Sequence, residues 1–91
     1  MKVDLEFKSI PSFYYKEQDG SKPNTCRKIE ESDPRDKILS EGYPRYIRIR
    51  NAGNPKLSFI RKITDVSYWD GIWIISWKHE ILENKASRLE G

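Results

Sequence analysis

The run of nine residues from Gly20 to Lys28 gathers several side chains that can take part in chemistry. A Gly-Ser pair with a proline two residues later predicts a turn. From Thr25 onward the side chains are expected to alternate as in a strand. Lys22, Thr25 and Arg27 should therefore meet where a loop enters a strand. Two cations and a hydroxyl in this arrangement can bind an anion or the polar edge of a nucleobase.

The spacing Gly20-x-Lys22-x-x-Thr25-x-Arg27 resembles the motif of the ASCH domains, which are small β-barrels of the PUA-like group. In that family the motif follows a short helix and opens a strand of the barrel. The resemblance covers roughly residues 13 to 30. It implies binding of RNA or a modified nucleoside in a cleft beside the barrel.

One branch of that family, the small N4-acetylcytidine amidohydrolases, uses the lysine and threonine of the motif with a glutamate further along the chain. Lys22 and Thr25 match these two positions, which makes them candidate catalytic residues. A lysine can act as the base that activates a hydroxyl for attack on an amide. Contact with a phosphate or nucleobase, without catalysis, is the alternative role. By sequence position alone, the candidates for the carboxylate are Glu30, Glu31, Asp65 and Glu80.

Arg27 is the expected anchor of the site, because a planar guanidinium can bind a phosphate or a base edge through two parallel hydrogen bonds. The alternative is an ion pair with Glu30 or Asp33. The preceding residue, Cys26, should face the opposite way as a small, buried apolar side chain.

Further basic and aromatic residues extend the predicted binding surface. Arginines alternate with apolar residues over Arg45–Arg50, and a turn at Asn51–Pro55 should pair this strand with the next. The alternative for these arginines is a solvated face that protects an edge strand. Trp69 is expected at a hairpin tip, where an exposed ring can stack on a base, and its alternative is a place in the core. The complete set of predicted binding residues is Lys22, Thr25, Arg27, Arg48, Arg50, Arg61 and Trp69.

Composition limits the class of protein. The chain has 91 residues, which suit a single domain over residues 1–91, and its 12% aromatic content argues against disorder. The net charge of +3 is compatible with nucleic-acid partners. Cys26 is the single cysteine, and no Cys or His cluster has metal-ligand spacing, so we expect no metal or cofactor. No signal peptide or membrane-spanning run is evident, so we expect a cytoplasmic protein without membrane contact.

The pattern of residues predicts five strands and two short helices, and short strands need closure to hide their edges. We therefore expect a mostly β (α+β) domain that forms a small, partly open barrel, with residues 80–91 as a helical or frayed tail. The resemblance to ASCH domains implies that this barrel is of the PUA-like type. The expected elements are a strand over 2–8, a helix over Phe13–Gln18 capped by Ser12 and stopped at Gly20, a strand over Thr25–Glu30, a helix over Pro34–Glu41 capped by Asp33, a strand over Arg45–Arg50, a strand over Leu57–Ser67 with a bulge near Arg61 or Lys62, and, after an Asp-Gly turn, a strand over Ile72–Trp77.

Three functional hypotheses follow. The first is binding of RNA or a modified nucleoside or nucleotide through a cleft at the Gly20–Arg27 loop, which requires a basic and aromatic surface there. The second is an amidohydrolase that acts on an acylated nucleoside such as N4-acetylcytidine, which requires a carboxylate within hydrogen-bond reach of Lys22 or Thr25. The third is a protein-interaction module, of the kind encoded by phages or mobile elements, which requires an exposed apolar patch.

Overall fold

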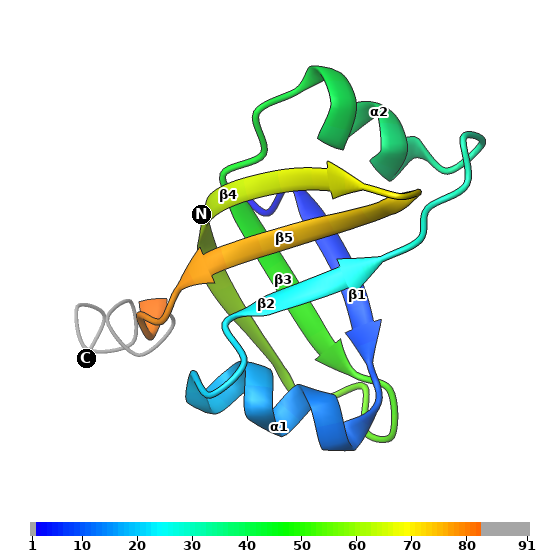
Figure 1. Ribbon diagram of the computed structural model, residues 1–91. Coiled ribbons are helices and arrows are strands. Elements are labelled where there is room, and N and C mark those ends of the chain that lie inside the picture. Colours follow the sequence, from blue (N-terminus) through cyan, green and yellow to red (C-terminus); the bar gives the residue numbers. More distant parts are fainter. Residues whose placement is uncertain (1, 83–91) are drawn as a thin grey trace.

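Five strands follow one another around a curled sheet that forms a half-barrel, and two short helices lie at its ends (Figure 1). The computed structural model describes residues 2–82. This architecture confirms the predicted mostly β fold class with five strands and two short helices. The elements are β1 (Leu5–Ser9), α1 (Pro11–Asp19), β2 (Asn24–Arg27), α2 (Pro34–Glu41), β3 (Tyr46–Asn51), β4 (Ser58–Trp69) and β5 (Ile72–Lys78).

The sheet has the order β1-β3-β4-β5-β2, so the first two strands of the chain are its two edges. β1 pairs with β3 in parallel, and the other neighbours are antiparallel. Because the sheet curls, its two edge strands approach each other, and α1 connects them at one end of the barrel (Figure 1).

Alternation along the strands builds the core. Most of the side chains that point inward are apolar, and α1 and α2 each add one buried apolar residue. The buried apolar residues are Leu5, Phe7, Tyr14, Leu39, Ile47, Ile49, Phe59, Ile75 and Trp77. The Tyr14 ring lies 5.2 Å from that of Phe59 between centroids, so α1 closes its end of the barrel with an aromatic contact.

The two helices begin at prolines, whose missing N–H costs nothing in the first turn. Asp33 caps α2 as predicted, and its carboxylate accepts from the backbone N–H of Arg35. The predicted cap of α1 was wrong, because that helix begins at Pro11 after Ile10 rather than after Ser12. No helix within residues 2–82 has both the length and the apolar character needed to cross a membrane.

Other boundaries differ from the prediction by a few residues. β2 ends at Arg27 instead of Glu30. The register shift of β4 lies between Ile63 and Asp65, not near Arg61 or Lys62. The part of the predicted C-terminal tail from residue 83 onward lies outside the described residues.

The β4–β5 hairpin turns at Asp70 and Gly71, which have φ values of 51° and 79°. Both residues have a left-handed backbone conformation, which a two-residue hairpin turn requires to match the twist of its two strands. The Asp-Gly signal is thereby confirmed. The turn leaves Trp69 at the hairpin tip with 71% of its surface exposed.

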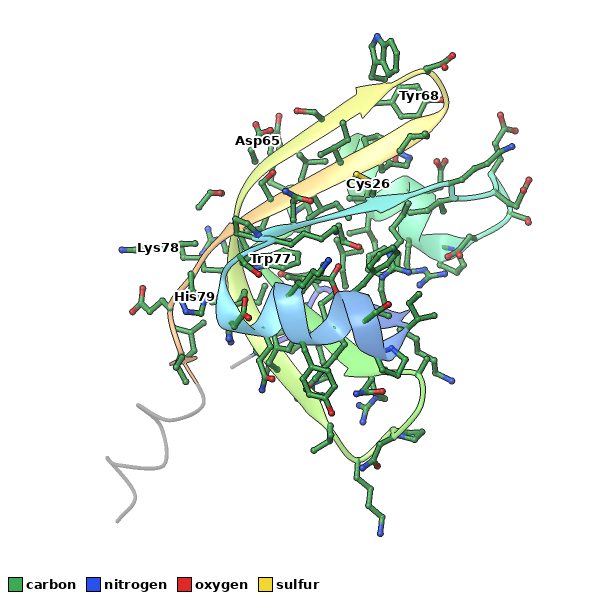
Figure 2. The ribbon with its side chains drawn as sticks, turned by 60° about the horizontal axis from the view of Figure 1, so that its bottom comes forward. Cys26, Asp65, Tyr68, Trp77, Lys78 and His79 are labelled. Carbon is green, nitrogen blue, oxygen red and sulfur yellow. The ribbon has the colours of Figure 1, made fainter. Side chains whose placement is uncertain are left out.

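Gly20 ends α1 in the left-handed conformation, with φ of 89°. His79, which follows β5, packs against it beside the end of α1 (Figure 2). A Cβ atom at position 20 would lie 2.8 Å from Cγ of the His79 ring. Gly20, the first glycine of the motif, is therefore required for two reasons: its backbone is left-handed, and the His79 ring leaves no room for a Cβ atom.

We expect Gly20→Ala to lower the free energy of unfolding by about 1–2 kcal/mol, because it adds left-handed strain and a clash with His79. Urea denaturation measures this change. Gly71→Ala is the matched control, since its φ is similar and nothing lies within 4 Å of the added Cβ. Equal losses in the two variants would show that the contact with His79 is not restrictive.

Candidate functional site

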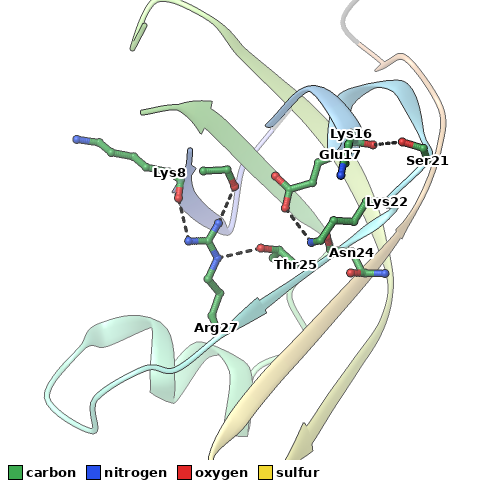
Figure 3. Close-up of polar contacts among 9 residues, drawn as sticks. Lys8, Lys16, Glu17, Ser21, Lys22, Asn24, Thr25 and Arg27 are labelled. Carbon is green, nitrogen blue, oxygen red and sulfur yellow. Dashed lines mark hydrogen bonds and ion pairs between the residues drawn. The ribbon is translucent and has the colours of Figure 1, made fainter. Parts of the chain in front are cut away.

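Arg27 bridges the two edge strands of the half-barrel (Figure 3). Its Nη1 donates to the carbonyl oxygen of Lys8 over 2.8 Å, and its Nη2 donates to Oγ of Ser9 over 2.8 Å. Its Nε donates to Oγ1 of Thr25 over 2.9 Å. Thr25 thus orients the guanidinium, and the guanidinium holds β2 against β1. These contacts replace the ion pairs with Glu30 or Asp33 that the sequence left open.

A second guanidinium lies beside the first. Arg35, in the first turn of α2, donates to the Asp33 carboxylate over 2.6 Å and to the carbonyl oxygen of Glu6 over 2.9 Å. The guanidinium carbons of Arg27 and Arg35 lie 4.9 and 4.5 Å from the centroid of the Phe7 ring. Both charges are therefore held over one aromatic ring, which attracts cations.

The environment of Arg27 is unusual for an arginine. Burial lowers its pKa, the Glu17 carboxylate opposes that change, and the positive charge of Arg35 lowers the pKa further. Arginine nevertheless stays protonated in proteins. The Asp33 carboxylate raises the pKa of Arg35 and balances part of its charge, and a bound anion would offset the repulsion that remains between the two guanidiniums.

These residues line a hollow of about 460 Å³, which we call the basic hollow. Its cations are Lys8, Arg27, Lys28 and Arg35, and its other lining residues are Glu6, Phe7 and Ile29. The carboxylate of Glu6 is engaged by the side chains of β3, at 3.8 Å from Arg48 and 3.3 Å from Arg50. Positive charge therefore dominates the hollow and continues across the outer face of β3.

Lys22 forms a separate cluster with Glu17 of α1 and the backbone of Asn24, whereas Thr25 belongs to the Arg27 contacts (Figure 3). Nζ of Lys22 lies 3.3 Å from Oε2 of Glu17 and 2.8 Å from the carbonyl oxygen of Asn24. Glu17 and Thr25 are only 1% and 2% exposed. Oε1 of Glu17 has no hydrogen-bond partner among the described residues. The ammonium of Lys22 is therefore the counter-charge of a buried carboxylate.

Sequence reasoning missed Glu17 and Arg35. Glu17 precedes the motif, whereas the candidate carboxylates Glu30, Glu31, Asp65 and Glu80 all follow it. The available signal was the helix stop at Gly20, which turns the chain back so that the N–H of Lys22 donates to the carbonyl oxygen of Lys16. For Arg35 the signal was its place directly after the Asp-Pro helix start.

The structure separates the remaining predicted binding residues. Arg48 and Arg50 lie on the outer face of β3, opposite Glu6 and Lys8 of β1 in the register, and so adjoin the basic hollow. Trp69 lies at the exposed tip of the β4–β5 hairpin and is not among the residues that line this hollow.

Arg61 does not share the surface of Arg48 and Arg50. It lies on the inner face of the sheet, in register with Ile47, and is 2% exposed. Its guanidinium donates to the carbonyl oxygens of Ile60 and Gln18 and lies 4.6 Å from the centroid of the Phe59 ring. Arg61 thus ties α1 to β4 inside the barrel.

The prediction for Cys26 was wrong, because this side chain is exposed (Figure 2). Thr25 and Arg27 face the interior of the seam between β1 and β2, so alternation turns Cys26 outward. β2 is an edge strand, and no element within residues 2–82 buries that face of Cys26.

The ion pair between Asp33 and Arg35 makes the folding stability depend on pH in the acidic range. Hydrogen bonds from the side chain and then the backbone of Arg35 lower the pKa of Asp33 from 3.8 to about 2. The stabilisation is present above the unfolded pKa of 3.8 and is lost as the pH falls from 3.8 through about 2. We therefore expect Asp33→Asn to lose less stability than the wild type over this range in urea denaturation. Parallel curves for the two proteins would contradict the pair's role.

No protein-family model matches the chain, and no curated protein matches it. The resemblance to ASCH domains stays a prediction from the motif at Gly20–Arg27. The chemistry of the site itself is the basis for assigning a function.

Proposed function

We propose that the protein binds RNA or a nucleotide through phosphate groups in the basic hollow, as an ASCH-like member of the PUA-like group. One observation carries the proposal: the guanidiniums of Arg27 and Arg35 are fixed over the same ring, Phe7, and line the same hollow. Lys8 and Lys28 add two more cations there.

Both guanidiniums are held by the protein before any ligand arrives. Three hydrogen bonds fix Arg27, and Asp33 with the carbonyl oxygen of Glu6 fixes Arg35. Each planar fork retains further N–H groups for an anion. A preorganised arginine loses less side-chain entropy on binding, and a phosphate accepts its parallel N–H groups well.

The extent of positive charge favours a ligand with more than one phosphate. Glu6 connects the basic hollow to Arg48 and Arg50 on the neighbouring strand. A strand of RNA lying across β1 and β3 contacts both groups, whereas a single phosphate fills only the hollow. The carboxylate of Glu6 is paired with both arginines of β3.

A ligand panel tests the proposal. Fluorescence anisotropy measures the affinity for a labelled single-stranded RNA of about eight nucleotides. Competition against this RNA measures the affinities for cytidine and cytidine monophosphate. We expect affinity to rise in that order and the affinity for RNA to fall steeply between about 50 mM and 200 mM salt. Tight binding of uncharged cytidine, or affinity that salt does not change, would contradict a phosphate site.

Hydrolysis of an acylated nucleoside is the second candidate, because Glu17 places a carboxylate 3.3 Å from Nζ of Lys22. Two observations rank it below binding. The hydroxyl of Thr25 is almost fully buried, and its oxygen already accepts a hydrogen bond from Arg27. Incubation with N4-acetylcytidine, followed by chromatography, should yield no cytidine. Release of cytidine that Glu17→Gln abolishes would reverse the ranking.

A further inference from the structure

A second hollow, of about 730 Å³, lies between α2 and the β4–β5 hairpin. We call it the acidic hollow, because Glu31, Asp36 and Asp65 line it and none of its lining residues is a lysine, arginine or histidine. It is separate from the basic hollow, although Ile29 contributes to both.

The three carboxylates are without a paired cation among residues 2–82. In that range none of them forms an ion pair, and the only hydrogen bond that their side chains accept is from Oγ of Ser67 to Asp65, over 2.7 Å. Elsewhere in this basic chain, carboxylates such as Glu6 and Glu17 are paired with arginine or lysine. The negative charge of this hollow is therefore available to a ligand.

The floor and rim of the acidic hollow are apolar and aromatic. Ile63, Val66 and Trp73 are partly buried and pack against the core. The Tyr68 ring meets Trp73 edge-on at 4.8 Å between centroids and is 60% exposed, and Figure 2 shows it on the same hairpin as Asp65. Tyr43 at the rim is 95% exposed. Exposed aromatic rings beside a cavity are typical of protein interfaces.

Carboxylates beside aromatic rings and aliphatic side chains match one kind of group, a cation carried on an apolar stem. Arginine and lysine have that form, since their methylene groups pack on apolar surface while the head meets carboxylates or ring faces. A nucleic acid does not fit, because its phosphates are repelled by three carboxylates. We propose that the acidic hollow docks an arginine- or lysine-bearing segment of a partner protein.

This docking site is independent of the proposed RNA site, and a titration followed by NMR on ¹⁵N-labelled protein tests it. The probe is the peptide acetyl-Leu-Arg-Leu-Arg-Leu-amide, and its glutamate counterpart is the negative control. We expect saturable shifts for amides in residues 39–43 and 63–68 with the arginine peptide, and no such shifts with the glutamate peptide. Absence of shifts at millimolar peptide, or equal shifts with the glutamate peptide, would overturn the proposal.

Charge removal supplies the second part of the test. Combining Glu31→Gln with Asp65→Asn should lower the affinity for the arginine peptide at least about tenfold, since both carboxylates line the hollow. Glu30→Gln removes an adjacent exposed carboxylate that does not line the hollow, and should leave the affinity unchanged. Equal affinity of all three proteins would contradict the site. Concentration-dependent self-association that the double variant abolishes would assign the hollow to a second copy of the chain instead.

Discussion

Replacing Arg27 and Arg35 together by glutamine is expected to weaken binding of single-stranded RNA about 100-fold in fluorescence anisotropy. Each guanidinium supplies charged hydrogen bonds, which contribute about 1.5–3 kcal/mol apiece. Since about 1.4 kcal/mol is a factor of ten in affinity, two lost contacts reach about 100-fold. The slope of log affinity against log salt should also fall by about two, because two phosphate contacts disappear.

A single substitution separates binding from folding. Arg27 also joins β2 to β1, so its loss affects the fold, whereas Arg35 is anchored mainly by Asp33 on its own helix. Arg35→Gln alone should lower the affinity for RNA about tenfold. Arg45→Gln is the matched control, since it removes an exposed arginine that does not line the basic hollow. Unchanged affinity in a folded Arg35→Gln protein would refute the phosphate site.

Lys22→Met is expected to lower the free energy of unfolding by about 3 kcal/mol. The substitution leaves the Glu17 carboxylate buried without its counter-charge, and a buried unpaired charge is costly. For a domain of this size the melting temperature should fall by about 12–24 °C. The motif predicts a binding or catalytic role for Lys22, and the ion pair adds a role in stability.

A rescue variant distinguishes a lost ion pair from lost packing. Replacing Glu17 and Lys22 together by methionine removes both charges and keeps apolar volume, so most of the stability should return. Lys16→Met is the matched control, because Lys16 is an exposed lysine on α1, the helix that carries Glu17. A double variant as unstable as Lys22→Met would show that the charge pair is not the cause.

The sequence predicted those features that depend on neighbouring residues. Gly20 stops α1, Asp33 caps α2, and Asp70-Gly71 forms the hairpin turn, because each depends on backbone conformation within a few positions. The inward faces of β1 and β3 also followed from strict alternation, as Ile47 and Ile49 show.

The sequence did not predict contacts that depend on strand register or on distant elements. Arg61 faces inward because β4 keeps its alternation until the shift between Ile63 and Asp65, whereas a bulge at Arg61 would have turned it outward. Arg27 meets β1 only because the curled sheet brings its two edges together. The pairing of Glu17 with Lys22 likewise depends on how α1 packs on the barrel.

An NMR titration of ¹⁵N-labelled protein with a short single-stranded RNA tests whether the basic hollow holds phosphate. We expect the largest amide shifts in residues 6–8, 27–29 and 35, with smaller shifts along β3. Shifts concentrated in residues 63–68 of the acidic hollow, with none around Arg27 and Arg35, would contradict the phosphate site.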